Sequence, residues 1–409
     1  MIVNTEQQRL KIALLTSLDP KDRRSWSGTI YHVAQALQKH CGDVTPIGPI
    51  DCAKQKLIGK IRNRMSEIFL KKKVMFTHGS LIAKHCAKVA TQRLSQQKFD
   101  VIVAPTGETE IAFLNTNLPI VLVTDSTYRI MRDYYPAFSN ILNSSFRELE
   151  MVESRAIQAS DLLLYASEWA ARSAIADYHA DKEKVHVIPF GANLEYTPPA
   201  KILQERKRSD RCRLLFIGVK WERKGGDIAF ETLLELEKMG IPAELTVVGC
   251  IPPKQFAHKS MKVIPFLNKN DEVQRKELEQ LYLRSDFLLF PTRNECYGIV
   301  VCEANAFGLP VIAADTGGVA GVVTEGENGF LLPLSARGAQ YAEVAAKLYQ
   351  DERRYAELVQ ASRAAFDSRL NWDVWGISVQ KLLQELPGHT RVGKNSEQFI
   401  SVTGSVNTL

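Results

Sequence analysis

The sequence lacks long hydrophobic runs, paired cysteines and an evident metal-binding motif. None of the apolar stretches in its 409 residues reaches the ~18 residues of a transmembrane helix. Its seven cysteines include no C-x2-C pair, and no Asp-x-Asp motif is evident. We therefore expect free thiols in a reducing cytoplasm, no membrane span and no metal site.

A basic leader and a histidine cluster are missing as well. The N-terminal stretch MIVNTEQQRLKIALLTSLDP contains a short apolar run but neither a basic leader nor a small-residue cleavage site. We expect it to form a first strand and not a signal peptide. Among the eight histidines, His78 and His85 have no carboxylate neighbour at ligand spacing, so they predict no metal site.

Cations are plentiful, but they gather in one segment. The formal net charge is +6, and segment 54–73 alone carries eight lysines or arginines against a single acid, a local charge of +7. The rest of the chain therefore sums to about −1, which argues against a general nucleic-acid surface. The eight cations are Lys54, Lys56, Lys60, Arg62, Arg64, Lys71, Lys72 and Lys73.

The same segment carries apolar residues at helical spacing. This combination suits an interfacial helix on an anionic membrane, at the inner face of which the protein would be peripheral. The alternative is a solvated helix packed on its own domain. The apolar residues are Leu57, Ile58, Ile61, Met65, Ile68 and Phe69.

Continuous apolar strands alternate with helical patterns along the whole chain. Such strands are typical of parallel sheets covered on both faces, so the sequence predicts an α/β protein with two Rossmann-like halves. The predicted strands are 11–17, 44–48, 100–106, 120–125, 161–167 and 185–190, then 213–218, 243–249, 262–267, 286–292, 310–315 and 329–333. The main predicted helices are 29–40, the basic segment, 80–96, 138–158, 298–307, 335–350, 352–368 and 371–386.

A stretch with proline and glycine early and charge late, residues 187–211, indicates the crossover between the halves. We expect a hinge there, near Pro189–Asn193. The predicted domains are 1–190 and 191–370. A helix at 371–387 would follow them, and 388–409 would form a disordered tail.

The stretch NECYGIVVCEANAFGLPVIAAD carries the clearest site pattern. A buried strand leads into it, a turn and an apolar helix follow, and Gly308 ends that helix before the next strand. Glu295 lies in the turn and Glu303 inside the helix, where a buried acid costs several kcal/mol unless it has a partner. Because Gly298 precedes the first helical amides, the helix start suits a phosphate.

A second pattern, FIGVKWERKGGD, places two cations beside glycines. We expect Arg223 and Lys224 at a turn, with Gly225 and Gly226 opening a helix. Two cations at a glycine-rich helix start suit a diphosphate. Lys220 is a further candidate.

Two loops of the first half carry candidate ligand-binding residues. SWSG places Ser27 and Gly28 before a helix, where a glycine lets backbone amides reach a phosphate. Trp26 is either a packing residue or a platform for an acceptor. The strand in VLVTDSTY ends near Asp125, which either accepts a hydrogen bond from a substrate or caps the helix that follows.

The stretch around Glu295 and Glu303 resembles the Glu-x7-Glu signature of the retaining glycosyltransferases of the GT4 family, which have the GT-B fold. The flanking FPTRNECYG, EANAFGLPVIAAD and ENGFLLP stand in the matching order. The resemblance implies a hexosyltransferase with a nucleoside-diphosphate sugar as donor and a saccharide or lipid-linked acceptor. It also implies that 1–190 binds the acceptor, that 191–370 binds the donor and that the helix at 371–387 returns to the first domain. We expect no cofactor and no nucleic acid as partner.

The resemblance also implies roles for individual residues. Glu295 orients the donor sugar as a catalytic residue, and Glu303 binds the ribose hydroxyls. The expected phosphate-binding residues are Arg223, Lys224, Gly298, Ile299 and Val300, with Lys220 as a further candidate and Ser27 and Gly28 from the first half.

The sequence departs from the family pattern at three places. Asp125 stands where many members have a histidine, and we count it with Glu295 as catalytic. Val219 takes the place of an arginine, and Ala320–Gly321 the place of a Pro-Glu pair. These departures leave open a non-catalytic sugar-nucleotide binder. A GT-B sugar-nucleotide epimerase is the other alternative.

Overall fold

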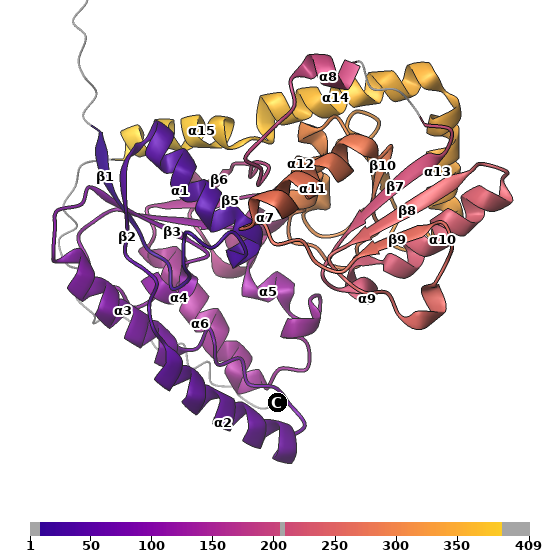
Figure 1. Ribbon diagram of the computed structural model, residues 1–409. Coiled ribbons are helices and arrows are strands. Elements are labelled where there is room, and N and C mark those ends of the chain that lie inside the picture. Colours follow the sequence, from indigo (N-terminus) through magenta and orange to yellow (C-terminus); the bar gives the residue numbers. More distant parts are fainter. Residues whose placement is uncertain (1–8, 205–208, 387–409) are drawn as a thin grey trace, which may run out of the picture.

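Two parallel β-sheets organise the chain (Figure 1). The computed structural model describes residues 9–204 and 209–386. Within these ranges the strand orders are β2-β1-β3-β4-β5-β6 and β12-β11-β10-β7-β8-β9. Both sheets are six-stranded, so the predicted α/β architecture of two facing halves is confirmed. The predicted tail at 388–409 lies outside the described residues.

The strands match the predicted ones to within a few residues. The predicted strand 262–267 ends at Ile264, because Pro265 cannot donate to a sheet ladder. The bounds are β1 (Leu10–Leu14), β2 (Gly42–Pro46), β3 (Val101–Pro105), β4 (Ile120–Thr124), β5 (Leu162–Tyr165) and β6 (Val185–Val187), then β7 (Cys212–Ile217), β8 (Ala243–Val248), β9 (Met261–Ile264), β10 (Phe287–Phe290), β11 (Val311–Ala314) and β12 (Gly329–Leu332).

The helices of the N-terminal half cover both faces of its sheet. The helix predicted at 138–158 begins later, because Pro136–Phe138 forms a separate 3-10 turn, η2. The helices are α1 (Thr29–His40), α2 (Ala53–Phe69), α3 (Ser80–Leu94), α4 (Glu108–Ile111), α5 (Tyr128–Met131), α6 (Asn143–Ala159) and α7 (Glu168–Tyr178), with the 3-10 turn η1 (Ser25–Gly28) before α1.

The C-terminal half repeats the arrangement. A short helix, α8, interrupts the predicted crossover, and α11 was not predicted. The helices are α8 (Ala200–Gln204), α9 (Trp221–Lys224), α10 (Gly226–Lys238), α11 (Glu272–Arg284), α12 (Ile299–Ala306), α13 (Gly338–Gln350), α14 (Glu352–Arg369) and α15 (Trp372–Glu385). None of the helices in the described ranges is long and apolar enough to span a bilayer.

The central strands form the core of each half. Every residue of β3, β4, β10 and β11 is buried. Full burial of a Val, Leu or Ile side chain contributes about 1.5–3 kcal/mol, so these short strands account for much of the folding free energy. Their continuous apolar character thus reflects helices on both faces.

The last helix lies on the first domain. α15 packs along α1 (Figure 1), where Gly376 allows close approach, since a Cβ there would fall 2.6 Å from the His40 ring. Asp373 forms an ion pair with Lys39 at 2.6 Å and contacts His40. The chain therefore crosses between the two sheets twice, once after β6 and once before α15.

Candidate active site

A cavity of about 610 Å³ lies between the two sheets. Its walls come from segments that follow the carboxyl ends of parallel strands, including the residues after β4, β7 and β10. Ligands of doubly wound α/β folds bind at this edge. Of the residues predicted from the sequence, those lining the cavity are Ser27, Asp125, Arg223, Lys224, Glu295, Gly298, Ile299, Val300 and Glu303.

Lys220 and Gly28 are not part of the cavity lining. Lys220 is exposed and immediately precedes α9. Gly28 instead shapes the backbone: its φ of +95° is left-handed, and a Cβ would lie 3.0 Å from the Arg23 carbonyl oxygen. The neighbouring Ser27 and Thr29 reach the cavity in its place.

The helix start at Gly298 is open toward the cavity. Gly298 has a φ of +113°, which favours glycine, and no side chain caps the α12 amides. Ile299 and Val300 form the first turn and line the cavity. The unpaired amides and the helix dipole therefore face the space where an anion could bind.

Glu303 has the partners that its burial requires. The residue is 2% exposed, and its carboxylate accepts a hydrogen bond from the Tyr282 hydroxyl at 2.7 Å and is paired with Lys269. Lys269 follows β9 and Tyr282 belongs to α11, so both come from elements far from α12 in sequence. Neither partner is predicted from the sequence.

Glu295 lies in the turn before α12 and is paired with Lys224. Its backbone N–H donates to the Tyr134 hydroxyl at 2.8 Å, so a residue of the first domain holds this turn. Gly317 and Gly318 permit the loop after β11 to pack on the same turn. A Cβ on either would fall 2.0 Å from the carbonyl oxygen of Glu295 or of Cys296, respectively.

Arg223 and Lys224 form the end of a short helix, α9, rather than the open turn that was expected. The reason is local packing, since Trp221 at the start of α9 is buried against Gly226. Arg223 donates to the Tyr135 hydroxyl at 2.7 Å and to the Asn294 carbonyl oxygen at 2.9 Å. Both cations therefore point into the cavity from one side.

The loop before α1 has a strained backbone. Trp26 and Ser27 have φ values of 46° and 60°, a region of backbone conformation that residues other than glycine rarely occupy. The Asn193 amide donates to the Ser27 carbonyl oxygen at 3.0 Å and secures the loop. Trp26 packs edge-on against Phe190, with ring centroids 5.3 Å apart, and also lines the cavity. Strain of this kind is common at ligand sites.

Asp125 projects into the cavity from the end of β4. Burial, and after it the negative charge of Glu295, raise its pKa from 3.8 to about 7. The capping alternative is wrong, because Thr127 and not Asp125 occupies the N-cap of α5. A carboxyl group with this pKa can exchange a proton near neutral pH.

Two further acids line the N-terminal wall and were not predicted. Burial raises the pKa of Glu108 from 4.5 to about 7. Burial also raises the pKa of Glu153 well above its usual value, and this side chain accepts the Tyr128 N–H at 2.7 Å. Glu108 follows β3 by three residues, and an acid directly after a buried strand was the signal that could have revealed it.

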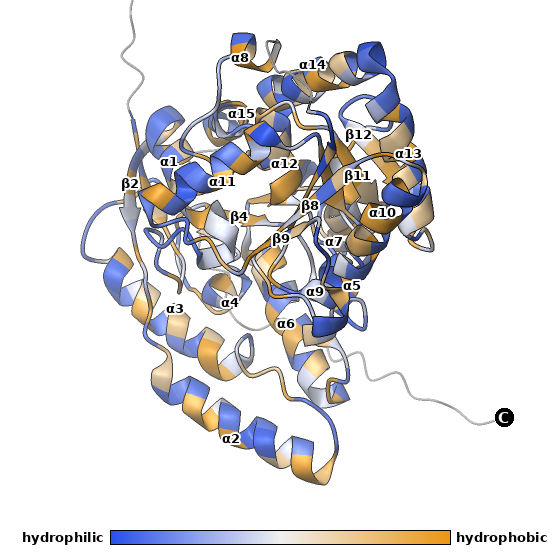
Figure 2. Ribbon diagram, turned by 45° about the vertical axis from the view of Figure 1, so that its right-hand side comes forward, coloured by the Kyte–Doolittle hydropathy of each residue, from blue (hydrophilic) through white to orange (hydrophobic). Residues whose placement is uncertain are grey.

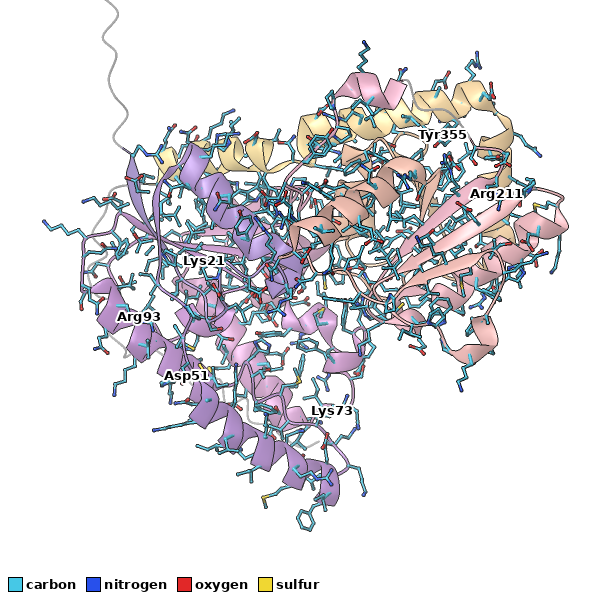
Figure 3. The ribbon with its side chains drawn as sticks, in the orientation of Figure 1. Lys21, Asp51, Lys73, Arg93, Arg211 and Tyr355 are labelled. Atoms are coloured by element: carbon cyan, nitrogen blue, oxygen red, sulfur yellow. The ribbon has the colours of Figure 1, made fainter. Side chains whose placement is uncertain are left out.

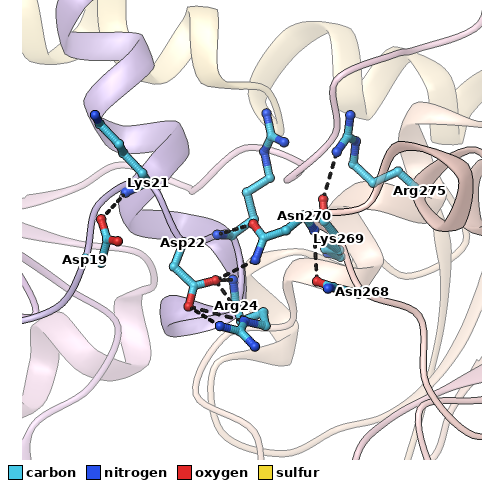
Figure 4. A network of polar contacts seen from close by, with 9 residues as sticks. Asp19, Lys21, Asp22, Arg24, Asn268, Lys269, Asn270 and Arg275 are labelled. Atoms are coloured by element: carbon cyan, nitrogen blue, oxygen red, sulfur yellow. Dashed lines mark hydrogen bonds and ion pairs between the residues drawn. The ribbon is translucent and has the colours of Figure 1, made fainter.

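Another set of polar contacts links the two domains beside the cavity (Figure 4). The Asn270 amide donates to the Asp22 carboxylate at 2.7 Å, and the Arg23 N–H donates to Asn270 at 3.0 Å. Arg24 binds the same carboxylate and, as the largest cause, lowers its pKa well below the usual range. Loops of the two domains therefore meet beside the cavity.

Groups of three or more metal-ligating side chains are absent from the residues that the structure describes. The positive charge facing the cavity comes instead from fixed cations. Arg223 and Lys224 lie on the C-terminal side, and Lys269 reaches the cavity beside Glu303.

Comparison with known proteins places this geometry in a family. Residues 200–365 match the model of the family described as glycosyl transferases group 1. The C-terminal half of this chain therefore carries a region that is similar to the group 1 glycosyltransferases. The matched region contains Arg223, Lys224 and the whole Glu295–Glu303 signature, so the resemblance seen in the sequence is confirmed.

Curated relatives carry related names. A D-inositol 3-phosphate glycosyltransferase of Xylanimonas cellulosilytica is 30% identical over 242 residues, which is 54% of this chain and 56% of that protein. Its counterpart in Corynebacterium jeikeium is 26% identical over 257 residues, 58% of this chain and 61% of that protein. The match to this chain thus spans little more than half the length of these relatives.

Solved structures extend the likeness to both domains. Sucrose-phosphate synthase from Thermosynechococcus elongatus superposes with a TM-score of 0.64 at 16% identity, over 92% of this chain and 99% of that one. Anabaena HepE in complex with UDP gives 0.61 at 17% identity, over 93% and 100%. WaaG, a glycosyltransferase involved in lipopolysaccharide biosynthesis, gives 0.58 at 17% identity, over 91% and 99%. The chain therefore has the GT-B fold.

Proposed function

We propose that this group 1 glycosyltransferase moves a hexose from a nucleoside-diphosphate sugar to a saccharide or lipid-linked acceptor with retention of anomeric configuration. One observation carries the proposal. Glu295 and Glu303 line a single interdomain cavity together with Arg223, Lys224 and the open start of α12. Two cations and a free helix start suit a diphosphate, and the carboxylates suit the hydroxyls on either side of it.

The donor would be held mainly by the C-terminal domain. Arg223, Lys224 and the amides near Gly298 bind the diphosphate, each charge-assisted bond contributing roughly 1.5–3 kcal/mol. Glu303 takes the ribose hydroxyls. Lys224 now contacts Glu295, so the diphosphate would compete with that carboxylate for the ammonium group. Such competition releases Glu295 to orient the donor sugar when the donor arrives.

Chemistry would take place where Glu295 and Asp125 face each other across the cleft. Negative charge develops on the leaving diphosphate, and fixed cations stabilise it without reorganisation. The leaving phosphate itself helps deprotonate the acceptor. Asp125, with its pKa raised to about 7, accepts a hydrogen bond from a substrate hydroxyl. We propose that the reaction needs neither a metal ion nor a separate cofactor.

The setting would be the cytoplasm. All seven cysteines are free thiols, and six of them are buried. Cys52 and Cys86 have their sulfur atoms 3.6 Å apart and are unbridged, an arrangement that suits a reducing compartment. The curated relatives are glycosyltransferases by name, and HepE binds UDP, which supports a nucleotide sugar as the donor class.

Donor turnover tests the proposal. The purified chain would be incubated with UDP-, GDP- and ADP-hexoses and a panel of saccharides, and the released nucleotide and the product anomer would be measured by chromatography and proton NMR. We expect transfer, or slow release of free sugar, with the anomer of the donor retained and with no loss on adding a chelator.

A pair of lysines provides the control. Lys224→Ala should lower turnover about 100-fold, because one preorganised contact to developing charge is worth roughly 3 kcal/mol. Lys220→Ala, four residues away and outside the cavity lining, should keep wild-type turnover. An isomerised nucleotide sugar would identify an epimerase, and donor binding without any turnover would identify a non-catalytic binder; either result rejects the proposal.

A further inference from the structure

Helix α2 packs on the first domain through small and polar residues. Gly59 and Ser66 are its buried residues. A Cβ at Gly59 would fall 2.4 Å from the Phe76 ring, so the helix can approach this closely only with glycine there. The Ser66 hydroxyl donates to the Lys72 carbonyl oxygen at 2.8 Å, and Asn63 accepts the Val74 N–H at 2.7 Å.

The opposite side of α2 presents its apolar residues to the outside. In a globular protein the apolar stripe of a surface helix normally faces the core. The orientation of α2 is therefore inverted, because its apolar side faces outward. Seven of the nineteen large apolar side chains that are exposed in the described ranges lie between residues 57 and 70. They are Leu57, Ile58, Ile61, Met65, Ile68, Phe69 and Leu70, and Phe69 is 75% exposed.

These side chains form one continuous stripe. At about 100° per residue, those on the helix fall within an arc of roughly 120°. Figure 2 shows apolar and polar residues alternating along α2, which lies at the edge of the molecule. Isolated apolar residues on a surface need no explanation, whereas a stripe of this length marks a surface that becomes covered.

Cations border the stripe on both sides. Arg62 follows one edge of the arc, and Lys60 and Arg64 follow the other; all three side chains are exposed. Exposed Lys71 and Lys72 continue the positive charge beyond the helix end. Lys73, labelled in Figure 3 near that end, instead turns toward the Pro136 carbonyl oxygen at 3.3 Å.

We propose that α2 and the lysines after it dock this protein on an anionic membrane surface. The helix would lie in the plane of the interface with the apolar stripe among the acyl chains and the bordering cations at the lipid head groups. The charge decides between occupants of the stripe. A second copy would bring its own segment of local charge +7 against this one, and like charges oppose that contact.

Vesicle flotation of the full chain tests the proposal. The probes are vesicles of phosphatidylcholine alone and vesicles with equal parts of phosphatidylglycerol and phosphatidylcholine. We expect the wild-type chain to float with the anionic vesicles only, and to be released as salt is raised. Lys71→Glu combined with Lys72→Glu should weaken this binding at least about tenfold, since each cation near the surface contributes.

Two further variants separate the apolar contribution from general effects. Ile61→Ser, Met65→Ser and Phe69→Ser together should abolish flotation. Ile251→Ser with Val273→Ser, which removes two apolar side chains of the other domain that are at least about as exposed as the three tested ones, should leave it unchanged. All three variants should keep wild-type circular dichroism and donor turnover in solution, since none of these residues lines the cavity.

Three outcomes would overturn the proposal. The chain could fail to bind anionic vesicles. It could bind them as tightly after charge reversal. Light scattering could instead reveal a concentration-dependent dimer that the triple serine variant abolishes, in which case a second copy covers the stripe.

Discussion

At the scale of single residues, each carboxylate of the signature already has a lysine partner. Lys224 pairs with Glu295, and Lys269 pairs with the almost fully buried Glu303. Removing one member of such a pair leaves the other charge without compensation, which is strongly destabilising in a buried site. Amide replacements keep the shape and the hydrogen-bonding oxygen, so they separate the function of each acid from its packing.

We predict that the two signature acids differ in kinetic effect. Glu303→Gln should chiefly raise the donor KM, because a ribose contact exists in both the ground state and the transition state. Glu295→Gln should lower kcat by about 100-fold, since it loses a contact to the sugar as positive charge develops. Steady-state kinetics on variants matched by thermal melting would measure both, with Glu327→Gln, an exposed acid, as the control. Wild-type kcat in Glu295→Gln would contradict the assignment, and parallel loss of folding and activity in both variants would indicate a packing role.

We predict an acid limb in the pH profile that belongs to Asp125. Its pKa of about 7 means that the carboxylate takes up a proton as the pH falls below neutral, so kcat/KM should drop about tenfold per pH unit there. Asp125→Asn should be slow and lack this limb. Glu295→Gln should move the limb to lower pH, because the negative charge of Glu295 raises the pKa of Asp125.

The titration of Asp125 should also make folding stability depend on pH, but in the direction opposite to that of kcat/KM. The folded-state pKa is raised above 3.8, so the protonated form favours folding and stability falls as the pH rises from about 4 to about 7. Asp125→Asn should therefore melt above the wild type at pH 8, with the difference shrinking toward pH 4. Thermal melts across this range give the measurement, and a constant difference would contradict the raised pKa.

At the scale of elements, the sequence predicts most of the architecture. Apolar runs located all twelve strands of the described residues, and Gly308 marked the end of α12 within two residues. These signals are local, since a strand buried on both faces must be apolar throughout. The Glu295–Glu303 stretch was predictable for the same reason, because the strand, the glycine and the helix are contiguous.

The rest of the site depends on contacts that no local pattern encodes. Tyr282 and Lys269 reach Glu303 from 21 and 34 residues away, and Tyr134 reaches Glu295 across 161 residues. The inverted orientation of α2 could not be predicted from the sequence for a related reason. Periodicity identified its two sides, but the contact with Phe76 through Gly59 decides which side is buried.

At the scale of the whole molecule, the two domains are joined at one point by both chain crossings. The Ala192 N–H donates to the Leu370 carbonyl oxygen at 3.0 Å, and the Trp372 indole donates to Asn193 at 3.0 Å. Further contacts bridge the cleft itself, through Tyr135 to Arg223 and through Asp22 to Asn270. The two domains would therefore close about the point where the crossings touch, and this closure would change the contacts across the cleft.

We predict that Gly191 controls this pivot. A Cβ at Gly191 would fall 2.4 Å from the Trp372 backbone nitrogen, so Gly191→Ala must push the two crossings apart. The wild-type chain should become more compact in small-angle scattering on saturation with nucleoside diphosphate, since the diphosphate would draw Arg223 and the facing wall together. Gly191→Ala should show a smaller compaction and a higher donor KM while keeping its fold. Gly79→Ala is the matched control, because its added Cβ would make only an ordinary contact of 3.5 Å with Glu148. An unchanged scattering radius in the wild type, or wild-type compaction and KM in Gly191→Ala, would show that the domains do not close about this point.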